Sequence, residues 1–374
     1  MLEKLMQQLY QCSRCGFCRV WEWEGVESVC PTYPFTPGWE SQYARGRVRL
    51  ARATAEGEME ITPAMLEHVY QCTLCRNCEA HCPVGVPLGE IFHAWRVDLA
   101  AAGHNLPVHR QIAENVAEHR SLYGPRGGRK GAEVSEPRKV SVLYFPGCTT
   151  IRKARKVTKA TADLLGKLGV DFAVLEEDAC CGYPLYETGM VEQAKEAAQQ
   201  SMERIKRYDP DIIVTTCPSC YRVFRYIYPE ELGIEHGIEV LHMSQYLPEL
   251  VKGKLSGLPV RVTWHDPCVL GRHLGMYEEP RELLRLVPEL ELVEMYSNRE
   301  NAQCCGAGGG VMAAFDAISS EVAQRRLKQA ADCEAAVIST SCPACLVNFQ
   351  RAVSKAGLDL EVKDLVEIIN EALE

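Results

Sequence analysis

The segments "DIIVTTCPSC" (residues 211–220) and "AAVISTSCPAC" (residues 335–345) decide the fold of this chain. Each is a short run of apolar and β-branched residues that ends at a Cys-Pro-x-Cys unit. Runs of this length and composition are typical of buried strands. The two cysteine pairs lie 125 residues apart, so the pattern predicts two copies of one unit in which a strand ends at a cysteine pair.

Three further cysteines in each copy follow the same repeat. The first copy contains Cys148, Cys180, Cys181, Cys217 and Cys220, and the second contains Cys268, Cys304, Cys305, Cys342 and Cys345. The offsets between matching cysteines are 120, 124, 124, 125 and 125 residues. The flanking segments "KVSVLYFPGC" (139–148) and "PVRVTWHDPC" (259–268) match as well. This near-constant spacing indicates a tandem duplication.

Helical segments are expected between the strands, at residues 152–169, 190–208 and 312–330. Short strands that alternate with helices of this length predict βαβ units and a parallel sheet. Ligands of such sheets bind beyond the carboxyl ends of the strands. The repeated cysteines fall at those ends, so each copy is expected to gather its cysteines at one edge of its sheet.

A separate cysteine system occupies the first quarter of the chain. Its two runs contain Cys12, Cys15, Cys18 and Cys30, and then Cys72, Cys75, Cys78 and Cys82. The second run has the C-x2-C-x2-C-x3-C-P spacing of a two-cluster ferredoxin, in which the fourth cysteine of a run serves the other cluster. One [4Fe–4S] cluster is therefore assigned to Cys12, Cys15, Cys18 and Cys82, and the other to Cys72, Cys75, Cys78 and Cys30. A pair of four-cysteine zinc sites is the alternative, and the triplet spacing disfavours it.

The first run departs from the ferredoxin spacing, because eleven residues separate Cys18 from Cys30. Trp21 and Trp23 lie in this insertion. They either contact a partner protein, since aromatic residues are enriched at interfaces, or fold back on their own domain.

The expected fold class is α+β and α/β, with four parts. A mostly helical, ferredoxin-like domain for two clusters is expected at residues 1–110, followed by a linker at 111–139. The linker ends in the stretch "YGPRGGRKGAEVSEPRK", which is rich in glycine, proline and charge. The two tandem α/β domains are expected at 140–255 and 256–374.

Composition narrows the class of protein. The net charge of −9 and the pI of about 5.7 argue against a nucleic-acid-binding surface, which would be basic. The sequence has no apolar run of membrane-spanning length and no secretion-signal layout, so a cytoplasmic location is expected, with attachment to the inner membrane face through a partner left open. The 19 cysteines of so large a chain favour metal binding in a reducing compartment.

Vicinal cysteines are the unusual feature of each repeat. Neighbouring residues are too close for a relaxed disulfide, so Cys180–Cys181 and Cys304–Cys305 are expected to deliver two thiolates to one metal centre. The glycines of "CCGAGGGV" (304–311) would let the backbone approach that centre. His265, close to Cys268, is either a catalytic proton donor to a leaving thiolate or a hydrogen-bonded loop residue. Cys333 fits no motif and is expected to be a free, buried cysteine.

The repeated C…CCG…CxxC pattern resembles the cysteine-rich (CCG) domains of heterodisulfide reductases, and the whole arrangement resembles the D-type subunit of that enzyme. It is similar also to the iron–sulfur subunits of glycolate oxidase and anaerobic glycerol-3-phosphate dehydrogenase. The resemblance implies that each five-cysteine set holds a noncubane [4Fe–4S] cluster, besides the two cubane clusters of the ferredoxin-like domain. Zinc in one of the two CCG sites stays open.

The resemblance implies an oxidoreductase subunit that passes electrons through the cubanes to the CCG clusters, which reduce a disulfide or a related thiol couple. The alternative is an electron-transfer subunit without its own substrate, linking a flavoprotein dehydrogenase to a quinone or a membrane partner. A zinc-stabilised, non-enzymatic scaffold is a third interpretation. The expected partners are other redox subunits, either a flavoprotein or a b-type cytochrome.

Overall fold

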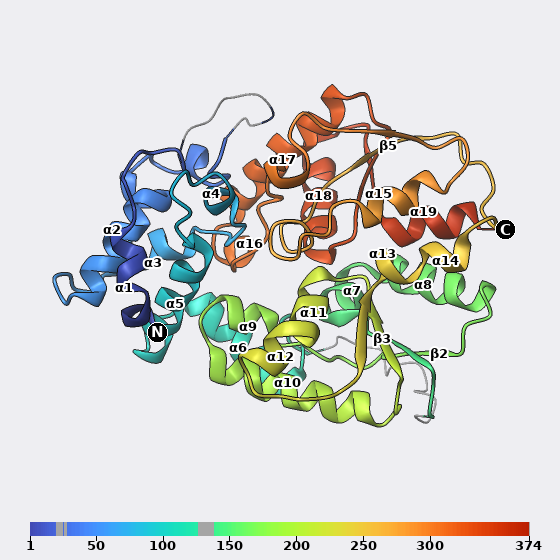
Figure 1. Ribbon diagram of the computed structural model, residues 1–374, viewed down its shortest axis with the longest axis horizontal. Helices are drawn as coiled ribbons and strands as arrows, with labels where there is room; N and C mark the ends of the chain where they lie inside the picture. The colour runs from blue at the N-terminus through green and yellow to red at the C-terminus, as the bar shows by residue number, and fades with distance from the viewer. Residues whose placement is uncertain (20–24, 26–27, 126–137, 374) are drawn as a thin grey trace.

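The computed structural model describes residues 1–19, 25, 28–125 and 138–373. Trp21, Trp23 and most of the predicted linker stretch lie outside these residues. Figure 1 shows three parts: a helical N-terminal part in blue, and two α/β halves, the first green to yellow and the second orange to red. None of the helices in the described ranges is long and apolar enough to cross a bilayer.

The N-terminal part consists of short helices joined by the cysteine loops. These are η1 (Leu2–Leu5), α1 (Met6–Tyr10), η2 (Tyr33–Phe35), η3 (Glu40–Gln42), α2 (Ala44–Ala55), α3 (Pro63–Tyr70), α4 (Asn77–Ala80), α5 (Leu88–Ala101) and α6 (Pro107–His119). Helix α3 begins after Thr62, whose side chain accepts a hydrogen bond from the Met65 N–H and so caps the first turn. Val48, Val69 and Trp95 pack in the core of this part.

The first α/β half has four parallel strands in the order β2-β1-β3-β4. Its elements are β1 (Val142–Tyr144), α7 (Gly147–Lys153), α8 (Arg155–Lys167), β2 (Phe172–Val174), α9 (Tyr183–Glu187), α10 (Val191–Lys206), β3 (Ile212–Thr215), α11 (Pro218–Arg222), η4 (Val223–Ile227), α12 (Tyr228–Glu230), β4 (Glu239–His242), α13 (Met243–Tyr246) and α14 (Pro248–Val251). The central strands β1 and β3 are almost wholly buried.

The second half repeats this sheet, with the order β6-β5-β7-β8 and parallel pairing throughout. Its elements are β5 (Arg261–Trp264), α15 (Glu279–Arg285), β6 (Glu291–Val293), η5 (Arg299–Asn301), α16 (Val311–Ala314), α17 (Asp316–Asp332), β7 (Val337–Thr340), α18 (Pro343–Ala356), β8 (Glu361–Asp364) and α19 (Leu365–Ala372). The predicted parallel α/β repeat is therefore confirmed, and its central strands β3 and β7 belong to the two segments that end at Cys-Pro-x-Cys.

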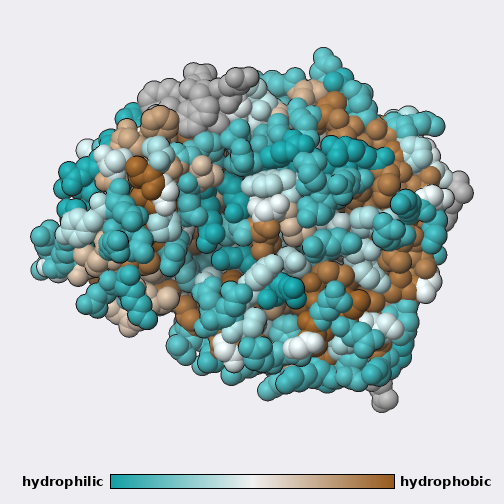
Figure 2. All heavy atoms as spheres, in the orientation of Figure 1, coloured by the Kyte–Doolittle hydropathy of each residue, from teal (hydrophilic) through white to brown (hydrophobic). Residues whose placement is uncertain are grey.

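The two halves pack closely on one another. Helix α19 of the second half lies against α8 of the first (Figure 1), and Lys167 Nζ donates to the Leu373 carbonyl at 2.8 Å. Helix α6 packs against α9 and α10 of the first half and against α16 of the second. Helix α6 also spans the predicted boundary between the ferredoxin-like domain and the linker, at residues 110 and 111. The predicted limits of the four parts stay predictions. Figure 2 shows a mostly hydrophilic face, with its larger hydrophobic patches over the α/β halves.

Candidate metal centres

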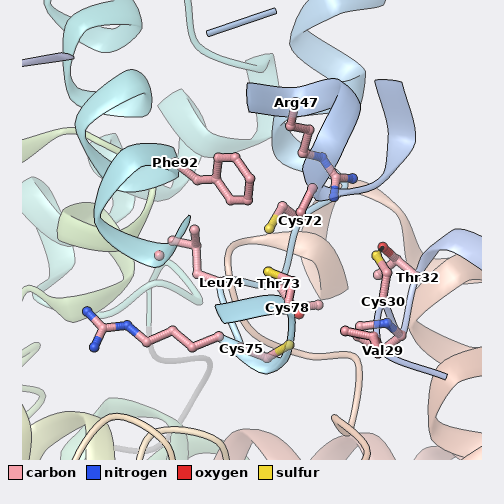
Figure 3. Close-up of a pocket in the computed structure, with 14 residues that line it drawn as sticks. Val29, Cys30, Thr32, Arg47, Cys72, Thr73, Leu74, Cys75, Cys78 and Phe92 are labelled. Atoms are coloured by element: carbon pink, nitrogen blue, oxygen red, sulfur yellow. Dashed lines mark hydrogen bonds between the residues drawn. The ribbon is translucent and has the colours of Figure 1, made fainter. Parts of the chain in front are cut away.

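Four cysteines from two distant loops line one pocket of the N-terminal part. Figure 3 shows Cys30, Cys72, Cys75 and Cys78 around this pocket, with Arg47 of α2 and Phe92 of α5 beside them. A second pocket is lined by Cys12, Cys15, Cys18 and Cys82. In each pocket, three cysteines of one run are thus joined by the fourth cysteine of the other run.

The loops that carry these cysteines share an uncommon backbone conformation. Arg14, between Cys12 and Cys15, has a φ of 61°, and Leu74, between Cys72 and Cys75, has a φ of 53°. Left-handed residues turn the chain sharply, which allows a short segment to present several sulfurs to one point.

The thiols of Cys18 and Cys78 are costly to ionise without a positive partner, whereas a hydrogen bond with Cys304 lowers the pKa of Cys75 to about 5. Burial raises the pKa of Cys18 to about 12 and raises the pKa of Cys78 well above its ordinary value. An iron core provides the positive charge that a thiolate needs. The donor set of four sulfurs per pocket therefore fits a cluster.

The first α/β half gathers five cysteines at the carboxyl edge of its sheet. Cys220 Sγ lies 3.4 Å from Cys181 Sγ, and the Cys148 thiol contacts that of Cys180. The Gly182 N–H points at Cys180 Sγ from 3.5 Å. Cys217, which completes the set, is buried and follows β3 by two residues.

The second half repeats this arrangement with shorter contacts. Cys345 Sγ lies 3.1 Å from Cys305 Sγ, and the Gly306 N–H lies 3.3 Å from Cys304 Sγ. Cys304 also contacts Cys268, and Cys342 follows β7 by two residues. Hydrogen bonds from Cys304 and Cys345, together with His265, hold the pKa of Cys305 well below its ordinary value.

His265 is fully buried beside these sulfurs. One of its ring nitrogens and the Sγ atoms of Cys305 and Cys345 lie within 4.8 Å of one another. Arg326 Nε donates to His265 Nδ1 at 3.1 Å, so the ring proton resides on Nε2. The ring also interacts with the Cys305 thiol. Burial lowers the pKa of His265, more than the neighbouring Cys305 raises it, and the imidazole is neutral near pH 7.

The glycine run approaches the N-terminal part rather than its own cysteines. A Cβ atom on Gly309 would lie 2.3 Å from the Cys72 carbonyl oxygen, and one on Gly308 would lie 2.9 Å from that of Thr73. Of the four glycines expected to surround the metal centre, Gly306 alone donates to a thiol sulfur within the described ranges. Gly308, Gly309 and Gly310 instead allow two loops from different parts to touch.

Side chains that no motif indicated hold this contact together. The buried Arg96 of α5 donates to the carbonyls of Cys72 and Gly309 at 2.6 and 2.9 Å, and also to those of Val69 and Glu187. Cys304 Sγ lies 3.6 Å from Thr73 Oγ1, and its thiol contacts that of Cys75. The second half therefore meets the Cys72–Cys78 loop directly.

A cavity of about 340 Å³ lies where the three parts meet. Residues adjacent to the cysteine loops line it, among them Leu74, Tyr183, Arg222 and His273.

Cys333 is not among the lining residues of this cavity. That cysteine is partly exposed rather than buried, which corrects the sequence-based expectation, and its thiol donates to the Ala330 carbonyl.

Family comparisons agree with this arrangement. The model of a 4Fe-4S dicluster domain matches residues 8–86, and that of a cysteine-rich domain matches residues 142–225 and 262–350. A solved Helicobacter pylori protein, described as hypothetical, shares the fold with a TM-score of 0.58 over 99% of this chain and 71% of its own, at 11% identity.

Curated relatives extend the likeness over nearly the whole chain. The D-type subunit of the dihydromethanophenazine:CoB–CoM heterodisulfide reductase of Methanosarcina acetivorans is 33% identical over 98% of this chain and 95% of its own. A subunit of the CoM/CoB fumarate reductase of Methanothermobacter marburgensis is 29% identical over 82% of this chain and 62% of its own. The EtfAB:quinone oxidoreductase of Syntrophomonas wolfei is 29% identical over 82% and 47%.

The fold and the cysteine sets thus define an iron–sulfur oxidoreductase subunit. The chain belongs to the family of CCG-domain proteins that includes the D-type subunits of heterodisulfide reductases. Relatives in this family are subunits of redox complexes.

Proposed function

We propose that this chain conducts electrons from the N-terminal part to the two CCG sites and that these sites reduce a disulfide or a related thiol couple. The observation that carries the proposal is the integrity of both five-cysteine sets. In each half, thiols of the vicinal pair contact thiols of the Cys-Pro-x-Cys unit and of the first cysteine. A subunit that only relayed electrons through one five-cysteine site would have no use for the other.

The pockets and loop clusters support the following ligand sets. Cys12, Cys15, Cys18 and Cys82 would hold one cubane, and Cys30, Cys72, Cys75 and Cys78 the other. The cysteines of each α/β half would hold one noncubane [4Fe–4S] cluster. When bound, such clusters accept and donate single electrons. The residues themselves hold the sulfurs close together, and they bury most of the sulfurs of the two α/β halves.

The proposed reaction breaks one S–S bond and consumes two electrons and two protons, giving two thiols. Electrons reach the chain from a partner redox subunit, either a flavoprotein or a b-type cytochrome. His265, buried beside Cys305 and Cys345, would donate a hydrogen bond from its Nε2–H to the released thiolate. Because this imidazole is neutral, the two protons consumed come from water. Arg326 donates a hydrogen bond to Nδ1 of His265, and this fixes the tautomer that carries its proton on Nε2.

An electron-transfer subunit without its own substrate is the second candidate. The likeness to the EtfAB:quinone oxidoreductase favours it. In that case the chain would pass electrons between a flavoprotein and a quinone-side partner.

The first test is the metal content of anaerobically purified protein. Four [4Fe–4S] clusters would give about sixteen iron atoms per chain and charge-transfer absorption in the visible. Cys305→Ser is expected to remove about four of these iron atoms, because Cys305 lies at the centre of its thiol group. Cys333→Ser is the matched control and is expected to leave the iron content unchanged. Stoichiometric zinc with little iron would contradict the proposal.

Disulfide reduction by the purified subunit, with a reduced viologen dye as donor, separates the two candidates. Cys305→Ser is expected to abolish turnover while the dye still reduces the N-terminal cubanes. Normal electron transfer to a partner without turnover of any disulfide by the wild type would favour the relay.

A further inference from the structure

Arg272 lies at the contact between the second CCG site and the Cys72–Cys78 loop. Its Nε donates to the Cys75 carbonyl at 2.7 Å, and its Nη1 donates to the carbonyls of Ala302 and Glu300. Cys75 belongs to one candidate centre, and Ala302 is two residues from Cys304 of another. The guanidinium therefore lies between the backbones of two candidate centres.

The charge of Arg272 is not neutralised by a carboxylate in the described part of the chain. Its hydrogen bonds there all go to backbone carbonyls, and its Nη2 is buried without a hydrogen-bond partner among the same residues. The groups that interact most with its charge are the thiols of Cys75, Cys268 and Cys304. The electrostatic partners of this cation are therefore sulfurs of two candidate centres.

The duplication provides an internal comparison. Arg152 follows Cys148 by four residues, as Arg272 follows Cys268. Arg152 Nε forms a partly buried ion pair with Asp178 Oδ1 at 2.9 Å. Asp178 precedes its vicinal cysteines by two residues, and the second copy has Ala302 at that position. The arginine thus has a carboxylate partner in the first copy, and its counterpart has none among the described residues of the second.

This difference has an electrostatic consequence. Reduction of an iron–sulfur centre adds one negative charge, and a nearby cation in a site of low dielectric stabilises the reduced form. Arg152 acts on its site as an ion pair of no net charge, whereas Arg272 acts as a full positive charge. The two halves are therefore electrically unequal although their cysteine sets match.

We propose that Arg272 raises the reduction potential of the centres held by Cys75 and by Cys268 and Cys304, and so directs electrons from the N-terminal part into the second CCG half. Arg272 acts on these centres through its positive charge and does not itself touch a reacting atom. The proposal rests on the proposed function, because it requires that these cysteines bind clusters.

The test is an anaerobic potentiometric titration of the full chain with dithionite, followed by electron paramagnetic resonance of the reduced centres. Arg272→Gln removes the charge, Arg272→Lys keeps it, and Ala302→Asp introduces the carboxylate that the first copy has. Arg152→Gln and Asp178→Ala are the matched variants of the first copy. Iron content and the visible spectrum are measured for every variant.

In Arg272→Gln and Ala302→Asp, the ratio of reduced to oxidised centre at a fixed potential is expected to fall on the order of tenfold, which corresponds to about 59 mV for one electron. Arg272→Lys is expected to keep most of the wild-type ratio, and Arg152→Gln is expected to leave these signals in place. Asp178→Ala is expected to raise the potential of the first CCG centre.

Fully loaded Arg272→Gln and Ala302→Asp proteins that titrate like the wild type would overturn the inference while leaving the proposed function intact. A wild-type chain that binds no iron would overturn the proposed function itself, and the inference with it. If Arg272→Gln fails to fold, Ala302→Asp decides the matter, since it leaves the arginine in place.

Discussion

Glu187 is a carboxyl group placed where the three parts of the molecule meet. Its Oε2 accepts a hydrogen bond from the Gly309 N–H at 3.0 Å. Burial raises the pKa of Glu187 to about 7, although the Gly309 N–H and Arg96 oppose this rise. Near neutral pH, this carboxyl therefore gains or loses its proton in response to small changes of pH.

Replacing Glu187 is expected to change how stability depends on pH. The folded protein holds a proton on Glu187 up to about pH 7, whereas the unfolded chain releases it near pH 4.5. The contribution of Glu187 to the free energy of unfolding is therefore fully present below about pH 4.5 and is lost as the pH rises through about 7. Glu187→Gln should lose less melting temperature between about pH 5 and pH 8 than the wild type, as measured by anaerobic thermal shift.

Glu192 offers a control for this measurement, because it is exposed and lies on the neighbouring helix α10. Glu192→Gln should keep the wild-type slope. Equal slopes for the wild type and Glu187→Gln would show that Glu187 is ionised throughout this range.

Single residues divide into those that the sequence could reveal and those that it could not. The cysteines and His265 stand in spaced motifs, and the structure places them in groups at the pockets and sheet edges. Arg96 and Arg272 carry no motif, since an isolated arginine in a helix or a loop has many ordinary roles. The offset of 120 residues between Arg152 and Arg272 is nevertheless visible in the sequence.

At the scale of elements, the glycine loop between η5 and α16 decides how closely two parts approach. Gly309 has a φ of 64°, which other residues adopt only at a cost. Its position also leaves no room for a Cβ, because the Cys72 carbonyl oxygen would lie 2.3 Å away.

Gly309→Ala is therefore expected to cost more stability than the same change at Gly357. Gly357 has a φ of 63° at the end of α18 but has no atom near its would-be Cβ. Gly357→Ala should cost about 1 kcal/mol for the backbone alone. Gly309→Ala should cost about 1–3 kcal/mol more, because one loop must move. Urea unfolding of both variants measures the difference, and equal costs would mean that the loops separate freely.

The elements themselves were largely predictable. The runs of β-branched residues that end at cysteine form β3 and β7, and the predicted helices appear as α8, α10 and α17. The edge strands β2 and β6 have three residues each and are only partly buried. So short a strand shows no alternation, and its pairing with β1 or β5 depends on the completed sheet.

At the scale of the whole molecule, the sequence could not predict how the N-terminal part sits on the two halves. That placement depends on side chains that donate to distant backbone carbonyls. His273 Nε2 contacts the Leu74 carbonyl, and His109 Nε2 contacts that of Gly310. Carbonyl acceptors exist at every residue, so their pairing leaves no mark in the sequence.

Arg96→Met is expected to loosen this placement. It would leave four carbonyls from three parts of the chain without their charged donor, at a cost of at least about 3 kcal/mol. Hydrogen exchange should rise at residues 69–74, 185–189 and 307–311. Arg281→Met is the control, since Arg281 is equally buried but bonds Asp266, Glu294 and Tyr277 within one half. Its effect should stay within that half.

The packing of α19 on α8 bears on how the protein is made. Lys167 and its acceptor Leu373 are 206 residues apart along the chain. During synthesis, the first half leaves the ribosome with one flank of α8 uncovered, and its cover arrives only after the second half has been made. Chaperones that shield apolar helices would then have their longest engagement with this flank.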